Sequence, residues 1–314
     1  MKCVRRTENG IEVLEVPVPS HEGVRVHVRS VGICQTDVNL ARFGPMPQTL
    51  GHEFAGELDD GTPVGIEPMI PCGECAQCDR GDYLYCEEGY TIIIGVGPGR
   101  DGGMAEQVVV PQRCLVPLPR GLGAGDACLI EPLAVNLHSL ALAHFKSGDR
   151  VCVVGAGLTG FGVLAAAAAA FRGGVVDLEA GSDHGRLAAE RLGIGTEPSG
   201  QYDIVIEADG SEESIARAAH WCRPAGTVLL VAGYYSDKLL SVGPYVAKEI
   251  SMVWGTWYGH HAAGRAVDSA AALLARQPAI AEALISHRMP LEAAPDAFAL
   301  IEGGEPSLKV VLEP

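Results

Sequence analysis

The stretch VCVVGAGLTGFGVLAAAAAA, residues 151–170, decides the fold. Its first four apolar residues predict a buried strand, and its alanine-rich end predicts a helix that starts near Thr159. The glycines between them form the pattern G-x-G-x-x-G. The first makes a tight turn, the second lets the backbone approach a pyrophosphate, and the third lets the helix pack closely on the strand. The predicted cofactor-binding residues of this turn are Gly155, Gly157, Leu158, Thr159 and Gly160.

Strands and helices alternate around this turn. An apolar helix is predicted over residues 131–145, a strand at Val175–Glu179 and a helix at His184–Leu192. Further strands are predicted at Ile204–Ala208 and Thr227–Val231. This alternation is typical of a parallel, doubly wound α/β sheet.

Both ends of the chain have a different pattern of predicted elements from its middle. The first 125 residues or so predict short strands between Gly/Pro turns, for example Val24–Val31, Ala105–Val110 and Cys114–Leu118. The elements predicted in the last fifty residues are helices at Ala262–Arg276 and Leu291–Glu302 and a strand at Leu308–Leu312. A chain of 314 residues suits two domains better than one core.

The net charge of the chain excludes two classes of expected binding partner. There are 23 Lys plus Arg against 39 Asp plus Glu, a formal net charge of −16. Such a surface repels nucleic-acid phosphates and anionic lipid, so neither is an expected partner. The opening MKCVRRTENGIEV is not followed by an apolar segment, and the longest apolar run, around Val163–Phe171, is too short to span a bilayer. We therefore expect a cytoplasmic protein.

Four of the ten cysteines fall within fifteen residues. Cys72, Cys75, Cys78 and Cys86 read C-x2-C-x2-C-x7-C, a spacing that lets all four thiolates turn toward one ion. Four thiolates close the coordination shell, so this pattern predicts a structural zinc. A disulfide framework is not expected, because a reducing compartment does not maintain one.

A second set of metal-ligand residue types is spread along the chain. Cys34 follows a predicted strand, His52 and Glu53 are adjacent, and Glu131 opens the apolar helix. A thiolate, an imidazole and a carboxylate make a three-ligand zinc site with a fourth position open for water or an alcohol oxygen. Asp37 can accept the second ring N–H of His52 and fix its tautomer.

Seven motifs together resemble one family. GICQTD, GHEFAG, the four-cysteine stretch, DGGMAEQVVVP, IEPLAV, GAGLTG and HRMPLEAAPDAFALIEGG are similar, in this order and over nearly the whole chain, to the medium-chain zinc-containing dehydrogenases, especially the sorbitol- and threonine-dehydrogenase-like branch. The resemblance implies a β-rich, GroES-like catalytic domain of residues 1–130 and 261–314 and a Rossmann domain of residues 131–260. It also implies a homodimer or homotetramer.

The resemblance further implies zinc-dependent oxidation of a secondary alcohol, polyol or amino alcohol, with hydride transfer to NAD or NADP. Cys34 and His52 are the expected catalytic ligands, and the third is either Glu53 or Glu131. Thr36 is expected to hydrogen-bond the substrate oxygen and pass its proton outward. Lys309 matches a position that holds a basic residue on the cofactor phosphates in relatives; the alternative is a solvated lysine on an edge strand.

Two departures from the family pattern bear on function. Residues 57–65 are shorter than the usual hairpin, and the interval from Cys34 to His52 is slightly short. Asn39 stands where relatives often carry the histidine that ends the proton relay, and an amide does not exchange a proton at neutral pH. The relay then stops at Thr36 and solvent, or uses another group such as His138.

The cofactor's ribose end leaves two alternatives. Glu179 lies nineteen residues beyond Gly160, where an acidic residue binds the ribose hydroxyls and selects NAD. Gly181 and Ser182 would make room for the 2′-phosphate of NADP, with Arg186 as its counter-ion. Asp177, Glu179 and Asp183 repel a phosphate, which favours NAD. The expected cofactors are therefore zinc and NAD, with NADP as the alternative.

The substrate is expected to be a small alcohol. The candidate pocket residues Phe43, Met46, Trp257 and Tyr258 would suit a ring, or they belong to the core. The rival hypotheses are an inactive zinc- and cofactor-binding protein with a regulatory or structural role, a zinc-free quinone or enoyl reductase, and a secreted disulfide protein. The four-cysteine stretch disfavours the second and the absent leader disfavours the third.

Overall fold

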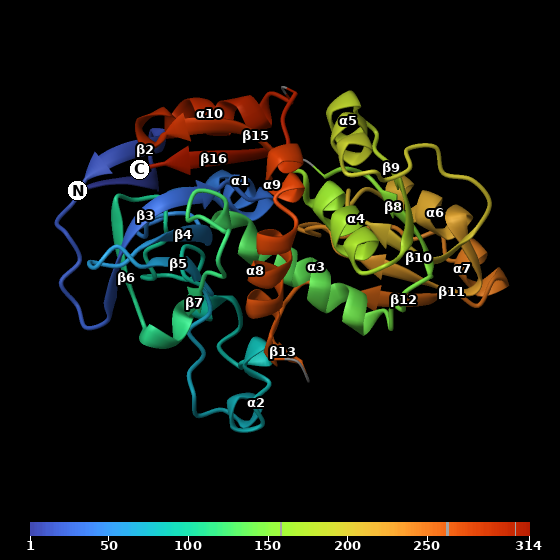
Figure 1. Cartoon of the computed structure of the whole chain (residues 1–314), viewed down its shortest axis with the longest axis horizontal. Helices are drawn as coiled ribbons and strands as arrows, with labels where there is room; N and C mark the ends of the chain where they lie inside the picture. The colour runs from blue at the N-terminus through green and yellow to red at the C-terminus, as the bar shows by residue number, and fades with distance from the viewer. Residues whose placement is uncertain (158, 262–263, 305) are drawn as a thin grey trace.

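The computed structural model describes residues 1–157, 159–261, 264–304 and 306–314. It contains two β-sheet units that lie side by side (Figure 1). One unit is built from both ends of the chain and the other from its middle. We call them the mixed-sheet unit and the parallel-sheet unit.

The mixed-sheet unit holds, among the described residues, a sheet of seven strands. Its order is β15-β16-β3-β4-β5-β7, and β6 also pairs with β3. Val311 and Leu312 pair with Gly32 and Val31, so the end of the chain joins its beginning in one sheet. The strands are β3 (Val24–Gly32), β4 (Glu53–Glu57), β5 (Pro63–Ile66), β6 (Gln107–Val110), β7 (Leu115–Pro117), β15 (Ile285–Pro290) and β16 (Lys309–Glu313).

A separate hairpin and several short elements complete this unit. The hairpin is β1 (Lys2–Thr7) and β2 (Gly10–Glu15), and β2 contacts α10 (Ala294–Glu302). Helix α10 buries its apolar side in the core that fills one face of the sheet. The short elements are α1 (Gln35–Arg42), α2 (Ala76–Asp79) and 3-10 turns at Tyr83–Tyr85, Gly89–Ile92, Gln112–Cys114, Ala127–Leu129 and Leu291–Ala293.

The parallel-sheet unit has, within the described chain, five strands in the order β12-β11-β10-β8-β9. All neighbours run parallel. The strands are β8 (Arg150–Val154), β9 (Val175–Glu179), β10 (Tyr202–Glu207), β11 (Cys222–Leu230) and β12 (Ser251–Trp254). Strand β8 lies between β9 and β10, so the order in which the strands are added reverses at β8. Sheets of this kind bind ligands in the crevice at the carboxyl end of the strand where the order reverses.

Helices follow the strands of this sheet. They are α4 (Phe161–Phe171), α5 (Asp183–Arg191), α6 (Glu212–Trp221) and α7 (Gly243–Ala247). Helices α4 and α5 lie where the sequence predicted helices. Helix α4 starts at Phe161 rather than near Thr159, because Gly160 adopts a left-handed φ of 73° and caps the helix. No helix in the described part of the chain is long and apolar enough to cross a bilayer.

The parallel sheet ends at β9 and has no further strand beside it among the described residues. Doubly wound dinucleotide-binding sheets carry a further strand beside the second one. Here the chain between α5 and β10 leaves only residues 192–201, and this segment makes one parallel bridge, between Gly195 and Asp177 of β9. Ten residues are too few for another strand and crossover helix.

Helices α3 (Ile130–Leu142) and α8 (Ala266–Arg276) lie between the two sheets (Figure 1). They contact each other; α3 also contacts α4 of one unit and β4 and β5 of the other. Almost every residue of α3 is buried, as expected for a helix with apolar side chains on all sides. The remaining elements are α9 (Ala279–Leu284), β13 (His260–His261) and β14 (Gly264–Arg265). The helix predicted to start at Ala262 begins at Ala266, and residues 262–263 lie outside the described chain.

Candidate active site and metal centres

Asp37 organises the first candidate metal centre. Strand β3 ends at Gly32, and Cys34 caps α1 with extended backbone. The buried Asp37 Oδ2 accepts the backbone N–H of Cys34 at 2.9 Å, and its Oδ1 accepts that of Gly51 at 3.3 Å. One carboxylate therefore joins the loop that carries Cys34 to the loop that carries His52.

Cys34, His52 and Glu53 converge at this point. Each offers one ligand atom, and these atoms lie within 4.8 Å of one another. His52 Nδ1 is 3.5 Å from Asp37 Oδ1. Burial lowers the pKa of His52, but the charges of Asp37 and Cys34 outweigh burial and raise its pKa well above the usual value. The structure thus brings Asp37 beside the imidazole, but His52 Nδ1 has no hydrogen-bond partner in the described chain, and the predicted donation of its N–H to Asp37 stays a prediction.

Lys309 takes a different partner from those expected. It is 1% exposed, so it is not a solvated edge lysine, and its Nζ donates to Glu53 Oε2 at 2.6 Å; its role on the cofactor phosphates stays a prediction. Burial lowers the pKa of Lys309, but the charge of Glu53 raises it and prevails. A Cβ at Gly32 would lie 2.5 Å from Glu53 Oε2, so a glycine makes room for the pair. The physical reason is that a buried carboxylate requires a cation.

Glu53 Oε1, in contrast, is buried with no hydrogen-bond partner in the described chain. An orphaned carboxylate oxygen beside a thiol and an imidazole fits a zinc ion, whose usual ligands are these three groups. Glu131, at the start of α3, lines the same cleft, and burial raises its pKa to about 7. It is not in the described group of ligand atoms around Cys34 and His52.

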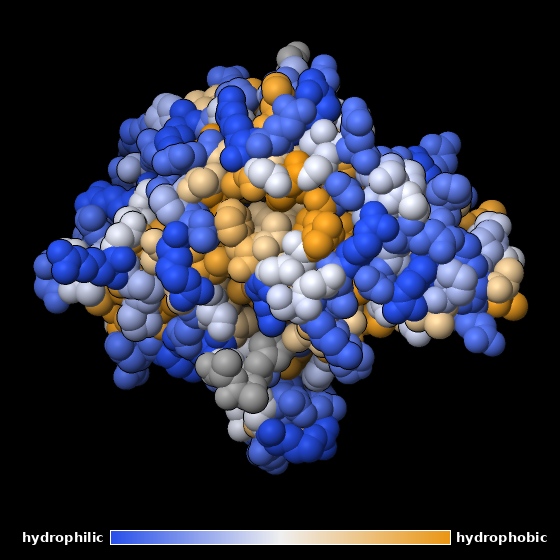
Figure 2. Space-filling view, turned by 45° about the vertical axis from the view of Figure 1, so that its right-hand side comes forward, coloured by the Kyte–Doolittle hydropathy of each residue, from blue (hydrophilic) through white to orange (hydrophobic). Residues whose placement is uncertain are grey.

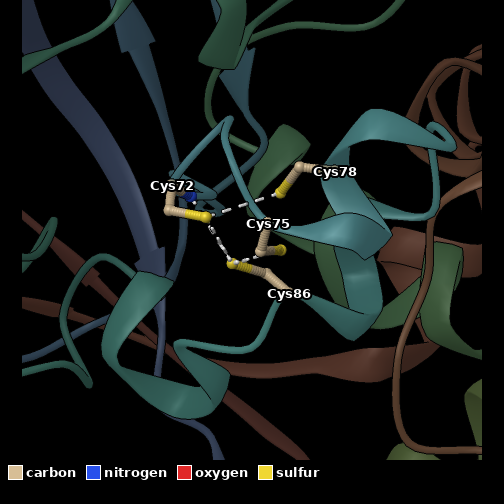
Figure 3. Close-up of side chains that lie close together, drawn as sticks. All are labelled: Cys72, Cys75, Cys78 and Cys86. Atoms are coloured by element: carbon tan, nitrogen blue, oxygen red, sulfur yellow. Dashed lines mark hydrogen bonds between the residues drawn. The ribbon is translucent and has the colours of Figure 1, made fainter.

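The second centre is a closed cage of sulfur atoms. Cys72, Cys75, Cys78 and Cys86 turn their Sγ atoms toward one another (Figure 3). They lie on the segment of residues 72–86, which contains α2 and projects from the molecule as a lobe (Figure 1). The Sγ–Sγ distances are 3.9 Å for Cys72–Cys78, 4.0 Å for Cys75–Cys86 and 3.5 Å for Cys86–Cys72. A tetrahedron of thiolates about 2.3 Å from zinc has edges of about 3.8 Å. Backbone N–H groups of Glu87 and Cys78 lower the pKa of Cys75 to about 6, which favours the thiolate.

A buried ion pair anchors the lobe. Tyr83 donates its hydroxyl to Glu67, and Arg265 Nη1 lies 3.2 Å from the same carboxylate. Arg265 also donates to the carbonyls of Arg113 and Leu115, at 3.0 and 3.1 Å. These residues lie up to 198 positions apart, so no local motif indicated their contact.

The glycine turn has the expected form with one difference. Gly155, Gly157 and Gly160 have φ of 89°, 74° and 73°, and Thr159 is buried beside them. Leu158 lies outside the described residues. A Cβ at Gly162 would lie 2.0 Å from the carbonyl oxygen of Gly155, whereas one at Gly160 would meet Leu308 at 3.1 Å. The close approach of helix and strand that we assigned to Gly160 therefore belongs to Gly162, which the motif did not include.

The predicted ribose corner is more occupied than the sequence suggested. Glu179 ends β9, and its Oε2 accepts the indole N–H of Trp221 at 2.6 Å. Its Oε1 lies 3.0 Å from Nε of Arg217, which lines the main cleft. Sequence reasoning missed both partners, because they come from α6 some forty residues away.

The two other candidates at this corner are engaged locally. Ser182 caps α5 by accepting the N–H of Gly185 at 3.2 Å. Arg186 is exposed and pairs with Asp183 at 3.3 Å and Glu190 at 2.8 Å. Ser182 and Arg186 also line a small pocket with Glu179.

One large cleft connects the metal ligands with the glycine turn. Its volume is about 1260 Å³. The cleft is lined by the candidate metal ligands, the glycine turn and the loops after β9 and β11: Cys34, His52, Glu53, Glu131, Gly155, Gly157, Thr159, residues 180–182, Arg217 and residues 231–236. In the space-filling view, apolar side chains gather around a hollow near the centre of one face, within a hydrophilic surround (Figure 2). Its position matches the crevice predicted at the carboxyl end of β8.

The expected pocket residues divide. Phe43, which is 76% exposed, Trp257 and Tyr258 line the cleft, whereas Met46 packs against the core of the mixed-sheet unit. The Tyr258 hydroxyl is buried and has no hydrogen-bond partner in the described chain. His138 is buried on α3 and is not among the described residues that line the cleft.

Thr36 and Asn39 also line the cleft, both on α1. Thr36 Oγ1 lies 2.8 Å from the hydroxyl of Tyr235, which comes from the loop after β11. This contact joins the two units across the cleft, and no sequence motif indicated it.

Comparison with known proteins agrees with this geometry. Residues 20–120 match the family model described as the alcohol dehydrogenase GroES-like domain. The chain is 28% identical to galactitol 1-phosphate 5-dehydrogenase of Escherichia coli (strain K12), with 100% of each chain covered. It is 31% identical to an uncharacterized zinc-type alcohol dehydrogenase-like protein of Haemophilus influenzae, covering 80% of this chain and 81% of that one. A zinc-binding dehydrogenase of Sinorhizobium meliloti 1021 bound to NADP superimposes with a TM-score of 0.84 at 28% identity, covering 100% of this chain and 99% of that one. The predicted fold, a GroES-like unit plus a Rossmann sheet, is thereby confirmed.

Proposed function

The chain belongs to the medium-chain, zinc-type alcohol and polyol dehydrogenases, and from this premise we propose that Cys34, His52 and Glu53 hold a catalytic zinc. The enzyme oxidises a small alcohol reversibly to a carbonyl compound, with zinc and NAD or NADP as cofactors. When bound, zinc polarises the substrate oxygen and the nicotinamide accepts the hydride. The observation that carries the proposal is the convergence of these three ligand types in the cleft that also contains the glycine turn.

Each residue around the substrate has a distinct task in this proposal. Asp37 holds His52 in one tautomer and positions Cys34 through its backbone N–H. Lys309 neutralises one oxygen of Glu53 and leaves the other free as a ligand. Thr36 accepts the proton that the substrate hydroxyl loses. Glu131, which lines the cleft outside the three-ligand group, stays near the site as a second carboxylate.

Cys72, Cys75, Cys78 and Cys86 hold the second, structural zinc in this proposal. The Sγ–Sγ distances of 3.5 to 4.0 Å suit a zinc tetrathiolate, and four protein ligands leave no place for a substrate. The lobe is therefore assigned to stability, together with the Glu67–Arg265 pair that anchors it.

The substrate is proposed to be a polyol or another alcohol with a second polar group. Phe43 and Trp257 provide apolar surface for the carbon chain. The galactitol 1-phosphate dehydrogenase relative also acts on a polyol derivative.

NAD is the proposed cofactor because Glu179 lies where a carboxylate receives the ribose hydroxyls and repels a 2′-phosphate. NADP is the second candidate, since Arg217 offsets the charge of Glu179 and the Sinorhizobium relative holds NADP. The dissociation constants of both oxidised cofactors, measured by fluorescence, decide between them.

The proposed domains are residues 1–130 with 261–314 and residues 131–260. The proposed assembly is a homodimer or homotetramer, supported by the edge strand β12 with its half-exposed Trp254. The cytoplasm is the proposed location, supported by ten cysteines that are all free. Sedimentation tests the assembly.

A panel of polyols, sugar alcohols, amino alcohols and secondary alcohols, assayed with each cofactor, tests the function. The expected result is cofactor reduction with at least one polyol and about two zinc ions per chain. One zinc per chain, retained in Cys34→Ser, together with no turnover of any alcohol would refute the catalytic site. The complete ligand set gives no support to the inactive alternative.

A further inference from the structure

Asn39 is held in a fixed orientation next to Tyr235. Its Oδ1 accepts from Gln35 Nε2 at 3.3 Å and from Arg42 Nη1 at 3.5 Å. With the oxygen occupied, the amide has its N–H₂ group left to offer Tyr235, and it lowers the pKa of that phenol. Asn39 can therefore only donate to Tyr235 and does not itself carry a proton away.

The loop after β11 directs Tyr235 into the cleft. The preceding residue, Tyr234, turns the other way: its hydroxyl donates to the buried Glu207 and its ring packs edge-on against Trp254. A Cβ at Gly233 would lie 2.4 Å from Cε2 of Tyr235. The Tyr235 ring therefore packs against the backbone of Gly233, at a place where a side chain would not fit. These contacts fix the ring and leave its hydroxyl 2.8 Å from Thr36 Oγ1.

The Tyr235 hydroxyl can donate and accept hydrogen bonds at the same time, as a proton relay requires. A phenol oxygen accepts two hydrogen bonds and donates one. When Thr36 donates to the phenol oxygen, the Tyr235 O–H is left to donate elsewhere. Tyr235 is 46% exposed, so water can reach that O–H.

We propose that Tyr235 is the outer member of the proton relay, in the place that Asn39 cannot fill. This inference rests on the proposed alcohol dehydrogenase function and names a further residue for it. The substrate hydroxyl gives its proton to Thr36 Oγ1, Thr36 gives its own proton to the Tyr235 oxygen, and Tyr235 gives its own to solvent. One proton enters and one leaves, so both side chains end neutral, and the hydride goes to the cofactor. Carbonyl reduction runs the same path inward.

The relay does not require either hydroxyl to ionise. Burial raises the pKa of Tyr235 and outweighs the hydrogen bond to Thr36, which lowers it. The titratable groups that act on this phenol are Cys34, whose charge raises its pKa, and His52, whose charge lowers it. Tyr235 thus stays protonated in the neutral range and works as a donor and acceptor together.

The test compares the zinc-loaded wild type with Tyr235→Phe, which keeps the ring and removes the hydroxyl. The rate of the first turnover is measured between pH 6 and 10, in water and in D₂O, with an alcohol found in the panel. At pH 7 we expect a fall of at least about tenfold and a larger solvent isotope effect, because proton transfer now limits the rate. The deficit should shrink toward pH 10, where hydroxide takes the proton from Thr36 directly.

Two matched variants separate the relay from a loop defect. Tyr234→Phe removes a hydroxyl from the adjacent residue, and its solvent isotope effect and pH profile should keep the wild-type shape. Asn39→His in the Tyr235→Phe background restores an exchangeable group beside Thr36 and should recover most of the lost rate. If Tyr235→Phe retains the wild-type pH profile and isotope effect, the relay is refuted.

A measurement without turnover tests the contact itself. 3-Fluorotyrosine is placed at position 235 of the zinc-loaded enzyme, without alcohol or cofactor, and its ¹⁹F resonance is followed. Thr36→Val removes the hydrogen bond and should shift the resonance and its titration; an unchanged resonance contradicts the proposal. If the wild type oxidises no alcohol, the proposed function fails and the relay with it. An active wild type with an unaffected Tyr235→Phe refutes the relay alone.

Discussion

Replacing Lys309 with methionine is the sharpest test of the buried charges at the metal centre. Lys309 and Glu53 are each 1% exposed, and Nζ and Oε2 are 2.6 Å apart. Methionine fills a similar volume but leaves the Glu53 carboxylate buried without its cation. Removing one partner of a buried ion pair costs about 3–5 kcal/mol.

This loss corresponds to a measurable change in melting temperature. An unfolding entropy of roughly 2.1 cal/mol/K per residue amounts to about 0.66 kcal/mol/K over 314 residues. The expected fall in Tm is therefore about 5–8 °C for the cofactor-free enzyme, measured by differential scanning fluorimetry in the Cys34→Ser background, where no zinc ion offsets the charge of Glu53. In the same zinc-free background, adding Glu53→Gln to Lys309→Met removes the unpaired charge, so this variant should melt above the one that carries Lys309→Met without Glu53→Gln.

Cofactor binding by Lys309→Met provides the result that would refute the pairing of Lys309 with Glu53. If Lys309 bound the cofactor phosphates, Lys309→Met would leave the Tm of the cofactor-free enzyme unchanged and weaken cofactor binding. That pair of results would contradict the assignment of Lys309 to Glu53. Additive losses in the double variant would also contradict it, because residues in direct contact show coupling.

Three further changes test other parts of the site. Cys34→Ser should keep the fold, lose one zinc and lose turnover, whereas Cys75→Ser should impair folding because it opens a closed tetrathiolate; metal analysis and circular dichroism distinguish the two. Gly162→Ala places a Cβ 2.0 Å from a carbonyl of the turn and should weaken cofactor binding at least about tenfold by titration, whereas Gly123→Ala, where a Cβ meets nothing within 4 Å, should not. Arg217→Ala removes the positive charge beside the ribose corner and should lower the affinity for NADP relative to NAD; an unchanged ratio of dissociation constants would contradict that role.

Features encoded by short-range spacing were predictable from the sequence. The four cysteines span fifteen positions, so the tight turns between them can bring their sulfur atoms together. The glycine turn follows from one strand, one turn and one helix. Even there the spacing misassigned one role, because Gly162 and not Gly160 makes the closest approach to the turn.

Features that depend on distant parts of the chain were not predictable. Lys309 and Glu53 are 256 positions apart, and Thr36 and Tyr235 are 199 apart. Each contact depends on how strands and units are placed: β16 beside β3 for the first, and the loop after β11 facing α1 for the second. A single lysine or tyrosine carries no pattern that reveals such a neighbour.

The division of labour between the units gives α3 a specific importance. The proposed ligands of both candidate metal centres come from the mixed-sheet unit, while the glycine turn and Tyr235 come from the parallel-sheet unit. Hydride transfer requires the two sets to be held at a fixed separation, because a small misplacement of reacting groups costs rate steeply. Helix α3 contacts β4, the strand that opens with Glu53, and also α4, the helix that follows the glycine turn. Its nearly complete burial therefore links the position of the ligands to that of the turn.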